Sequence, residues 1–393
     1  MKKLHILASG MILAAAPLFS IEFGGIFENT SNVKINRDDT ANPVIKQQDS
    51  VTLYTKIPLK NDGSVYFSAE GLIDYSYNTV LPDADYSTNE IITDLTLCKL
   101  SSVCSLGSGR LFFNAGRFAY SDYTALVISQ TADLVNIKYT NPYVELSAFG
   151  GYTGLLNAKN VSIINADYTV FSGDTSKQFY DLAAPFIIGG ASFSLPYVLA
   201  NQTITLEGLA AVASSGPSDY ESDGNRFYGT LGLTGPLGAS VFYNLSSTVG
   251  YNDDSDLSNL SKLSISFYPN FKSSSFTLSG VYASGENGSF KPFVPFTKKA
   301  AVVSYSEPYY SSLLKAGAAY SIIPAQSLFA SIAADAVFSY MESSPEYEGV
   351  QAALTITFQP FSDVRFNLMA DAYVSDDSEN NRKSITLNAV ISF

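Results

Sequence analysis

Apolar and polar residues alternate along this chain in runs of 11 to 15 residues, and this pattern restricts its fold more than any other feature. In residues 64–78 the odd positions are mostly apolar and the even positions mostly polar, and residues 327–341 and 364–374 alternate in the same way. Such alternation predicts β-strands with one apolar and one polar face. Strands of globular proteins average about 5–6 residues, whereas a tilted membrane-spanning strand needs about 9–11. The length of these runs therefore favours strands that cross a membrane.

The connections between these runs are of two kinds, which alternate along the chain. Some are short turns rich in Gly, Pro, Asn and Asp: 61–63, 107–109, 141–142, 235–238, 269–272, 324–326 and 359–363. Others are longer and polar or acidic: 36–49, 81–90, 215–225, 252–259 and 375–383. Short turns on one side and long loops on the other are typical of transmembrane β-barrels.

The sequence therefore predicts an all-β fold, a transmembrane antiparallel up-and-down β-barrel of about 16–18 strands formed by residues 21–393. Eighteen strands are expected at 21–32, 50–60, 64–78, 91–106, 110–121, 132–140, 143–153, 185–196, 202–214, 226–235, 238–250, 260–269, 273–285, 311–323, 326–341, 347–358, 363–375 and 384–393. Sixteen strands stay open, because the patterns at 122–131 and 286–310 are weak. An even number places both termini on the side of the short turns.

Residues 1–20 read as a secretory signal peptide that is cleaved. Lys2 and Lys3 precede an apolar stretch from Ile6 to about Ala16, and small residues follow up to Ser20. A buried first helix is the alternative. No later apolar run reaches the roughly 18 residues of a membrane helix. Cleavage would leave 21 basic and 36 acidic residues, a net charge of −15, and no histidine. An acidic chain without basic clusters argues against nucleic-acid binding.

The polar faces of the predicted strands carry charged residues, which favours a barrel with a wet lumen over a soluble β-sandwich. Only 15% of the residues are charged, whereas 13% are aromatic, and Tyr and Phe gather near the ends of the apolar faces, as they do at a membrane interface. The candidate lumen-lining residues are Glu70, Asp74, Lys138, Glu145, Glu207, Arg226, Lys262, Lys315, Asp335, Arg365 and Asp371.

The last ten residues, SITLNAVISF, alternate back from a terminal Phe393 and carry the resemblance to a known family. Together with the signal peptide and the turn pattern, they resemble bacterial outer-membrane β-barrel proteins of the porin kind, and the acidic, Trp-free composition is similar to that of spirochaete outer-membrane proteins. This resemblance implies that Ile391 and Phe393 form the signal read by the barrel-assembly machinery. It also implies an outer-membrane location, contact with outer-membrane lipid, and N- and C-termini in the periplasm.

For a barrel of this size, passive diffusion of small polar solutes or ions is the function we expect. The longest connection, 154–185, is a candidate constriction loop through Asp167, Asp174, Lys177 and Asp181, because porins narrow their pore with an inward loop. An external cap is the alternative for this loop. The second candidate is 285–300, which could also be an external flap. The small surplus of acidic over basic lumen residues predicts a weak preference for cations.

Two other functions stay open. One is a surface adhesin or structural barrel, and the other is a transporter of hydrophobic compounds, although little chain precedes the first strand to form a plug. An enzyme is not expected, because the mature chain would lack histidine for a Ser-His-Asp or metal site. No cofactor is expected either. Cys98 and Cys104 are expected to be free thiols, since a disulfide would require a turn between them. Homo-oligomerisation has no recognisable signature.

Overall fold

The computed structural model describes residues 21–36, 43–81, 87–171, 173–174, 177, 179–198, 200–222, 224–253, 256–286, 290–299, 310–340 and 344–393. The predicted signal peptide lies outside these residues. Eighteen strands cover most of the described chain: β1 Glu22–Asn36, β2 Val44–Pro58, β3 Val65–Val80, β4 Thr88–Leu106, β5 Gly109–Ser121, β6 Ser129–Thr140, β7 Glu145–Tyr152, β8 Phe186–Val198, β9 Gln202–Ala213, β10 Arg226–Pro236, β11 Val241–Asn252, β12 Leu257–Phe267, β13 Ser275–Ala283, β14 Leu313–Ala325, β15 Leu328–Ser339, β16 Glu346–Phe361, β17 Val364–Ser375 and β18 Arg382–Ser392. Two short 3-10 helices, η2 (Ala158–Asn160) and η3 (Ser378–Asn380), lie in connections.

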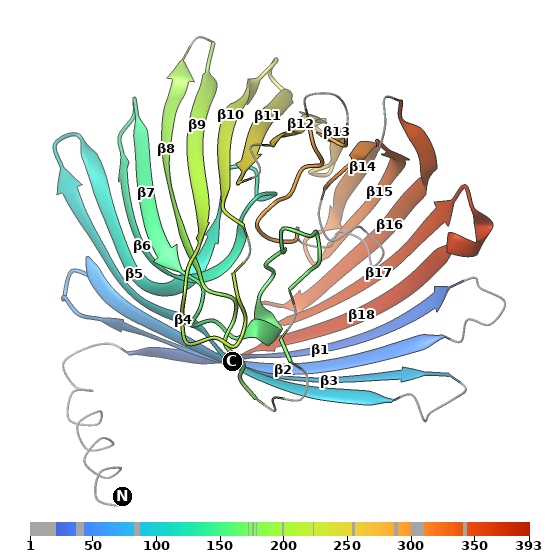
Figure 1. Ribbon diagram of the computed structural model, residues 1–393, viewed down its shortest axis with the longest axis horizontal. Coiled ribbons are helices and arrows are strands. Elements are labelled where there is room, and N and C mark those ends of the chain that lie inside the picture. Colours follow the sequence, from blue (N-terminus) through green and yellow to red (C-terminus); the bar gives the residue numbers. More distant parts are fainter. Residues whose placement is uncertain are drawn as a thin grey trace, which may run out of the picture.

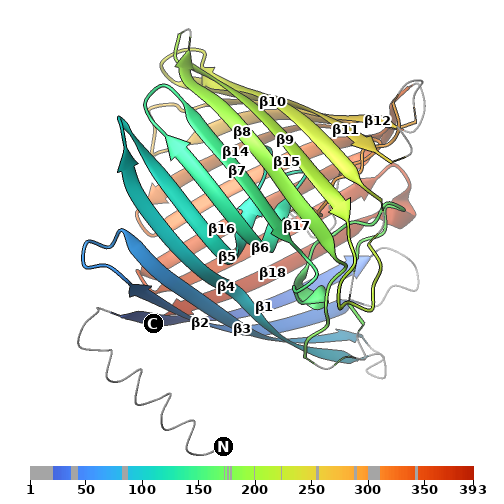
Figure 2. The ribbon, with the colours of Figure 1, turned by 60° about the vertical axis from the view of Figure 1, so that its left-hand side comes forward.

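The strands form one closed antiparallel sheet in which each strand pairs with its neighbours in the chain. The ring closes between β1 and β18, from the pair Ile26↔Ser392 to the pair Asn36↔Arg382. Phe393 completes the closure, because its backbone N donates to Gly25 O and its backbone O accepts from Gly25 N. The predicted all-β up-and-down barrel is thus confirmed, with eighteen strands (Figures 1 and 2).

The two kinds of connection lie at opposite ends of the barrel. Both β1 and β18 reach the end that carries the short turns, whereas the long connections gather at the other end (Figure 2). The short-turn end holds many exposed aromatic side chains: Phe23, Tyr54, Tyr143, Phe193, Tyr197, Phe242, Phe267, Tyr268, Phe271, Phe276, Tyr320, Phe329, Phe358, Phe361, Phe366 and Phe393. They form an aromatic band like those found where barrels meet a membrane interface.

The two faces of the wall differ as the alternation predicts. On β18, Ile385 and Leu387 are 58% and 51% exposed, and they point to the outer face. Asn388 faces inward, where its Nδ2 donates to Glu28 Oε1 and to Thr30 Oγ1 on β1. Polar side chains thus bond to one another across the inner face, and apolar side chains cover the outer face.

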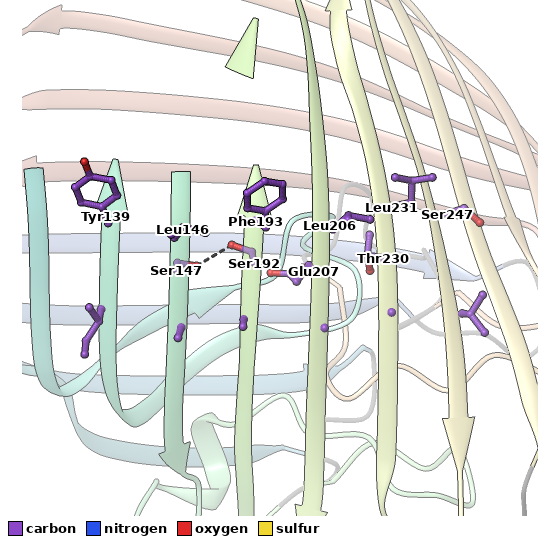
Figure 3. Close-up of a pocket in the computed structure, with 16 residues that line it drawn as sticks. Tyr139, Leu146, Ser147, Ser192, Phe193, Leu206, Glu207, Thr230, Leu231 and Ser247 are labelled. Carbon is purple, nitrogen blue, oxygen red and sulfur yellow. Dashed lines mark hydrogen bonds between the residues drawn. The ribbon is translucent and has the colours of Figure 1, made fainter. Parts of the chain in front are cut away.

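Figure 3 shows the same alternation in the wall from β6 to β11. Ser147 and Ser192 face inward, with their hydroxyls 2.8 Å apart, while the adjacent Leu146 and Phe193 face outward. A row of small residues, Ala148, Ala191, Gly208 and Gly229, crosses four neighbouring strands in register. The row lies on the outer face, where it leaves a recess of about 980 Å³ between larger side chains such as Leu146 and Phe193.

Several strands extend further toward the loop end than the sequence predicted. Residues 36–49 were expected to form one loop, but β1 continues to Asn36 and β2 begins at Val44. Polar side chains hold this extension together, because Asn29 Nδ2 donates to Asp49 Oδ1 and Ser31 Oγ donates to Gln47 Oε1. Polar Gln47 and Asp49 interrupt the apolar face of β2 here, whereas exposed Val33 and Ile35 continue that of β1.

Both cysteines lie on the same strand, β4, and both are free thiols. A continuous strand places Cys98 and Cys104 too far apart for a disulfide.

Candidate functional site inside the barrel

The hairpin of β5 and β6 leaves the barrel wall at its loop end. Its own ladder continues to the pair Ser121↔Ser129. The ladder to β4 ends earlier, at Cys98↔Arg117, and the ladder to β7 ends at Asp133↔Tyr152. Neither neighbouring strand follows the last residues of the hairpin. The hairpin tip, residues 122–128, is therefore free to fold into the lumen.

Gly116 lies where the hairpin departs from the wall. Its φ is +118°, a conformation that L side chains rarely adopt. A Cβ at this position would lie 2.1 Å from the backbone oxygen of Cys98 on β4. Two separate reasons therefore require glycine at this position: the backbone angle and the close approach of β4.

The hairpin tip folds inward over β7 and β8 and contacts the wall at β9 and β10. The backbone N of Tyr123 donates to Glu207 Oε2 on β9 (2.9 Å), and the Tyr120 hydroxyl donates to Glu207 Oε1 (3.3 Å). The ring of Tyr123 fills the space above Gly232 on β10, where a Cβ would lie 2.3 Å from it. Inside the tip, Asp122 Oδ1 accepts from the backbone N of Val127 and of Ile128, so one carboxylate organises the turn.

Two further connections fold inward and pack against this tip. One is the long segment, residues 153–185, and the other is the proline-rich segment, residues 284–299 (Figure 1). The backbone N of Phe296 donates to Val127 O (2.9 Å), and the backbone N of Ile164 donates to Phe296 O (2.9 Å). Main-chain hydrogen bonds thus join all three inward segments.

An apolar core lies between the inward segments and the wall. The segments contribute Val127, Ile128, Leu156, Ala158, Val161, Ile163, Phe171, Ala183, Ala184, Phe293 and Phe296. The wall contributes Phe149, Ile188, Leu209, Ala211, Tyr228, Leu260, Val281 and Ala283, among others. Burying a side chain the size of Phe stabilises a structure by about 1.5–3 kcal/mol. Such a core fixes the inward segments in place, so they are part of the folded barrel.

Arg226 on β10 anchors two of these segments. It is only 3% exposed, and its Nη1 donates to Ile164 O (2.7 Å) and to Pro295 O (3.1 Å). Its guanidinium also stands 5.6 Å and 5.4 Å from the ring centres of Phe186 and Phe296. One buried cation therefore joins the long segment and the proline-rich segment to the wall.

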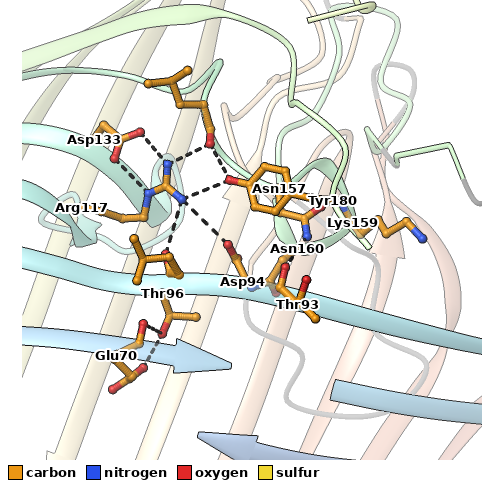
Figure 4. A network of polar contacts seen from close by, with 12 residues as sticks. Glu70, Thr93, Asp94, Thr96, Arg117, Asp133, Asn157, Lys159, Asn160 and Tyr180 are labelled. Carbon is orange, nitrogen blue, oxygen red and sulfur yellow. Dashed lines mark hydrogen bonds and ion pairs between the residues drawn. The ribbon is translucent and has the colours of Figure 1, made fainter. Parts of the chain in front are cut away.

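Because the hairpin turns inward, an opening remains in the wall beside the loop-end half of β4, and the long segment fills it. Figure 4 shows Arg117 at this position. Its Nε and Nη2 form a bidentate pair with Asp133 at 2.9 and 2.8 Å. Nη2 also donates to Leu155 O (2.8 Å), and Nη1 donates to the Tyr180 hydroxyl (3.2 Å). Arg117 therefore joins the hairpin to the segment that closes the opening.

The eleven predicted lumen residues lie on strands but in different surroundings. Glu207, Arg226, Lys315 and Asp371 are buried, each less than a tenth exposed. Glu207 and Arg226 hold the inward segments, so they do not border open water. Glu70, Asp74 and Asp335 accept hydrogen bonds from neighbouring strands, from Thr96, Gln48 and Gln351 respectively. Lys262 is half-buried and Arg365 is exposed.

Lys138 and Glu145 remain accessible inside the barrel. They form an ion pair of 2.6 Å between β6 and β7, with side chains 40% and 38% exposed. The pair lies toward the short-turn end, beyond the inward segments.

Three of the four predicted constriction residues join two loops. Asp181 is 2% exposed and accepts from Lys177 Nζ (2.6 Å), the Tyr220 hydroxyl (2.6 Å) and the backbone N of Asp174 (2.9 Å). Lys177 also pairs with Asp219 (2.7 Å). Burial alone would raise the pKa of the Asp181 carboxyl. The hydrogen bonds from Lys177, Tyr220 and Asp174 outweigh this effect, so the pKa lies below its usual range. We call this group the loop clasp.

Asp167 lies apart from the loop clasp, at an exposed turn of the long segment. Its Oδ1 accepts from the backbone N and the hydroxyl of Thr169, and these bonds hold its pKa below the usual range. Nearby, the Tyr168 hydroxyl donates to Pro292 O at 3.3 Å, which links this turn to the proline-rich segment.

Four residues that direct the hairpin inward were not predicted from the sequence: Gly116, Arg117, Asp122 and Tyr123. Residues 122–131 showed only a weak pattern, and Gly116 and Arg117 lie in an ordinary strand pattern at 110–121. A signal was present in the wall. Around Phe149, Ile188 and Leu209 the strands are apolar on both faces. An apolar inner face indicates that other parts of the chain cover it inside the barrel.

No group of three or more His, Cys, Asp or Glu residues that could hold a metal occurs among the described residues. Within the same part of the chain, no helix is long and apolar enough to cross a membrane.

The fold is similar to that of solved outer-membrane proteins. OccAB4 of Acinetobacter baumannii superposes with a TM-score of 0.61 at 12% identity, over 95% of this chain and 98% of that one. The outer membrane protein OpdK of Pseudomonas aeruginosa gives 0.61 at 10% identity, over 95% and 98%. A structure of OpdK with vanillate gives 0.61 at 8% identity, with the same coverage. No family model matches the chain, and no curated protein matches its sequence. The chain thus shares the barrel fold of these proteins, at identities that show the fold alone.

Proposed function

We propose that this protein is an outer-membrane channel through which small polar solutes or ions diffuse passively. The observation that carries this proposal is a closed barrel whose lumen is narrowed, but not filled by a separate domain, by the hairpin tip, the long segment and the proline-rich segment. A hydrogen-bonded polar inner face suits the passage of water and polar solutes. The similar fold of OccAB4 and OpdK supports the same function, and the structure of OpdK with vanillate shows that one such barrel accepts a small organic ligand.

We assign the constriction to the hairpin tip, where the Tyr123 ring stands against Gly232. The long segment, which the sequence suggested for this role, supports the tip from the loop side and closes the wall. In this proposal Glu207 positions the tip, because it accepts a hydrogen bond from the Tyr123 backbone.

Conductance of the purified barrel in planar bilayers tests both statements. We expect stable openings of uniform size, and a larger conductance for Tyr123→Ala, which removes the ring from the narrow region. Tyr143→Ala is the matched control, because Tyr143 is 78% exposed in a turn at the opposite end of the barrel. A folded protein without conductance would contradict the channel and favour an adhesin. Equal conductance of both variants and the wild type would contradict the assigned constriction.

We also propose that residues 1–20 are a cleaved signal peptide and that both chain ends of the mature barrel face the periplasm. In this orientation the short turns and the aromatic band lie at the periplasmic interface, and the long connections lie outside. Mass spectrometry of the protein isolated from outer membranes tests the cleavage. An intact N-terminus would contradict it.

A further inference from the structure

The opening in the wall beside β4 is bordered by strand residues without a neighbouring strand. Thr88–Leu97 of β4 have no partners on β5, because the β4–β5 ladder ends at Cys98↔Arg117. Two stretches of the long segment take the place of the missing strand, and we call them the panel (residues 154–158 and 179–183). They bond to each other through the Ala158 N–Asp181 O (2.7 Å) and Ala183 N–Leu156 O (3.0 Å) hydrogen bonds.

The panel has the two faces of a wall element. Leu155, Phe179 and Tyr180 are 47%, 53% and 38% exposed, whereas Leu156 and Ala158 are buried in the core of the lumen. The outer face of the wall is apolar up to this point, since exposed Ile73 and Tyr75 of β3 pair with Thr93 and Ile91 of β4. The panel therefore continues the lipid-facing surface across the opening.

The panel is attached to β4 by isolated contacts and not by a strand ladder. The backbone N of Thr93 lies 3.5 Å from Phe179 O, and Asn157 Nδ2 donates to Thr93 O at 3.0 Å. On the other side, Arg117 of β5 donates to Leu155 O and to the Tyr180 hydroxyl of the panel. Isolated contacts thus close this boundary, whereas on its other side the same half of β4 pairs with β3 from Gly71↔Leu95 to Asn78↔Thr88.

A cavity of about 740 Å³ lies along the boundary between β4 and the panel. Its lining combines apolar Ile91 and Phe179 with polar Asn78 and Asn89 and with the ion pair of Lys159 and Glu90 (2.9 Å). The Lys159 side chain is only 4% exposed, and Glu90 neutralises its charge, so this ion pair adds no net charge to the lining. The volume falls within the range of small-molecule sites, about 300–1,000 Å³. The chemistry suits an apolar chain joined to a neutral head that carries hydrogen-bonding groups.

We propose that the panel is a lateral gate through which neutral amphiphilic molecules, such as alkyl glycosides, pass between the barrel and the membrane. The cavity at its edge receives the molecule, with the chain against Ile91 and Phe179 and the head against Asn78 and Asn89. This route adds to the axial path of the proposed channel, and it does not depend on polar solutes passing along that path.

A reversible lock tests the gate. Thr93→Cys with Phe179→Cys, in a chain that also carries Cys98→Ser and Cys104→Ser, joins β4 to the panel where their main chains are 3.5 Å apart. Uptake of a decyl glycoside and of a small sugar is measured in a Gram-negative host that expresses the protein. Oxidation should lower glycoside uptake to the level of cells without the protein, leave sugar uptake unchanged, and be reversed by a reductant.

Unchanged glycoside uptake after complete oxidation would overturn the gate, as would a wild-type protein that supports no glycoside uptake. Loss of sugar uptake alone would count against the axial channel.

A second variant acts in the opposite direction. Tyr180→Phe removes the hydroxyl that accepts from Arg117 across the panel boundary, and loss of one such hydrogen bond shifts an equilibrium about fivefold. Glycoside uptake should rise while sugar uptake stays constant. Tyr143→Phe, in a turn at the other end of the barrel, is the matched control. Equal glycoside uptake by Tyr180→Phe and Tyr143→Phe would contradict the role of this bond.

Discussion

At the scale of single residues, Gly116 is a position where one added methyl group should disturb the hairpin. Gly116→Ala places a Cβ 2.1 Å from Cys98 O at a φ of +118°, so either the backbone or β4 must move. Strain of this kind costs about 1–3 kcal/mol. We expect the hairpin tip to lose its fixed position, and the barrel to unfold at lower temperature on a heat-modifiability gel. Gly150→Ala is the control, because its Cβ would meet no atom within 4 Å. Equal stability of the two variants would contradict this role.

Single residues also show where sequence reasoning ends. Glu207 and Arg226 were predicted on inward faces because their neighbours alternate in apolar and polar character. Their partners, Tyr123 N and Ile164 O, come from segments 84 and 62 residues away in the chain. Alternation has a range of two residues, so it gives the face of a side chain but not what covers that face.

At the scale of elements, the loop clasp should give the long segment a pH dependence. The pKa of Asp181 lies below its ordinary value of 3.8, so its contribution is present above that value and is lost as the pH falls through the depressed pKa. Hydrogen bonds to Asp181 and Asp219 raise the pKa of Lys177 above 10.5, so the lysine stays charged at neutral pH. We expect the backbone amide of Asp174 to be protected at pH 6 and to lose protection only as the pH falls below 3.8, in hydrogen exchange corrected for the intrinsic rate.

Lys177→Gln provides the comparison for this experiment. Without the ammonium group, Asp181 loses its charged partner, and protection at pH 6 should already be reduced. If the wild type and Lys177→Gln lost protection at the same pH, Lys177 would not be what holds the pKa of Asp181 down.

The strands and their ends differ in how well the sequence predicts them. The sequence located all eighteen strands, because each has an apolar outer face that lipid requires. It ended β1 and began β2 short of the loop end, since Gln47 and Asp49, which accept from Ser31 and Asn29, interrupt the apolar pattern of β2. The inward course of 122–128 could not be predicted either, since it depends on contacts with β9 and β10.

At the scale of the whole molecule, closure of the ring predicts a defect in assembly. Phe393 joins β18 to β1 through two main-chain hydrogen bonds to Gly25, and its ring occupies the space next to the Gly25 Cα. Phe393→Ala keeps the backbone bonds but removes the terminal aromatic ring. We expect less folded barrel in the outer membrane, measured as the heat-modifiable fraction. Phe23→Ala, also an exposed aromatic change at the same end, should assemble normally. Equal yields from the two variants would contradict the role of Phe393 as an assembly signal.

The charge of the whole lumen should set ion preference, and the pair Lys138–Glu145 offers a matched test of it. Of the seven predicted lumen residues that are not buried, four are acidic and three are basic, so we expect a weak cation preference in a salt gradient. Because Lys138 and Glu145 lie 2.6 Å apart and are both exposed, each can be neutralised at nearly the same place. Glu145→Gln should move the reversal potential toward anions, and Lys138→Gln should move it toward cations. Both shifts should shrink at 1 M salt, where the screening length is about 3 Å. Shifts of the same sign would show that shape, and not charge, sets the preference.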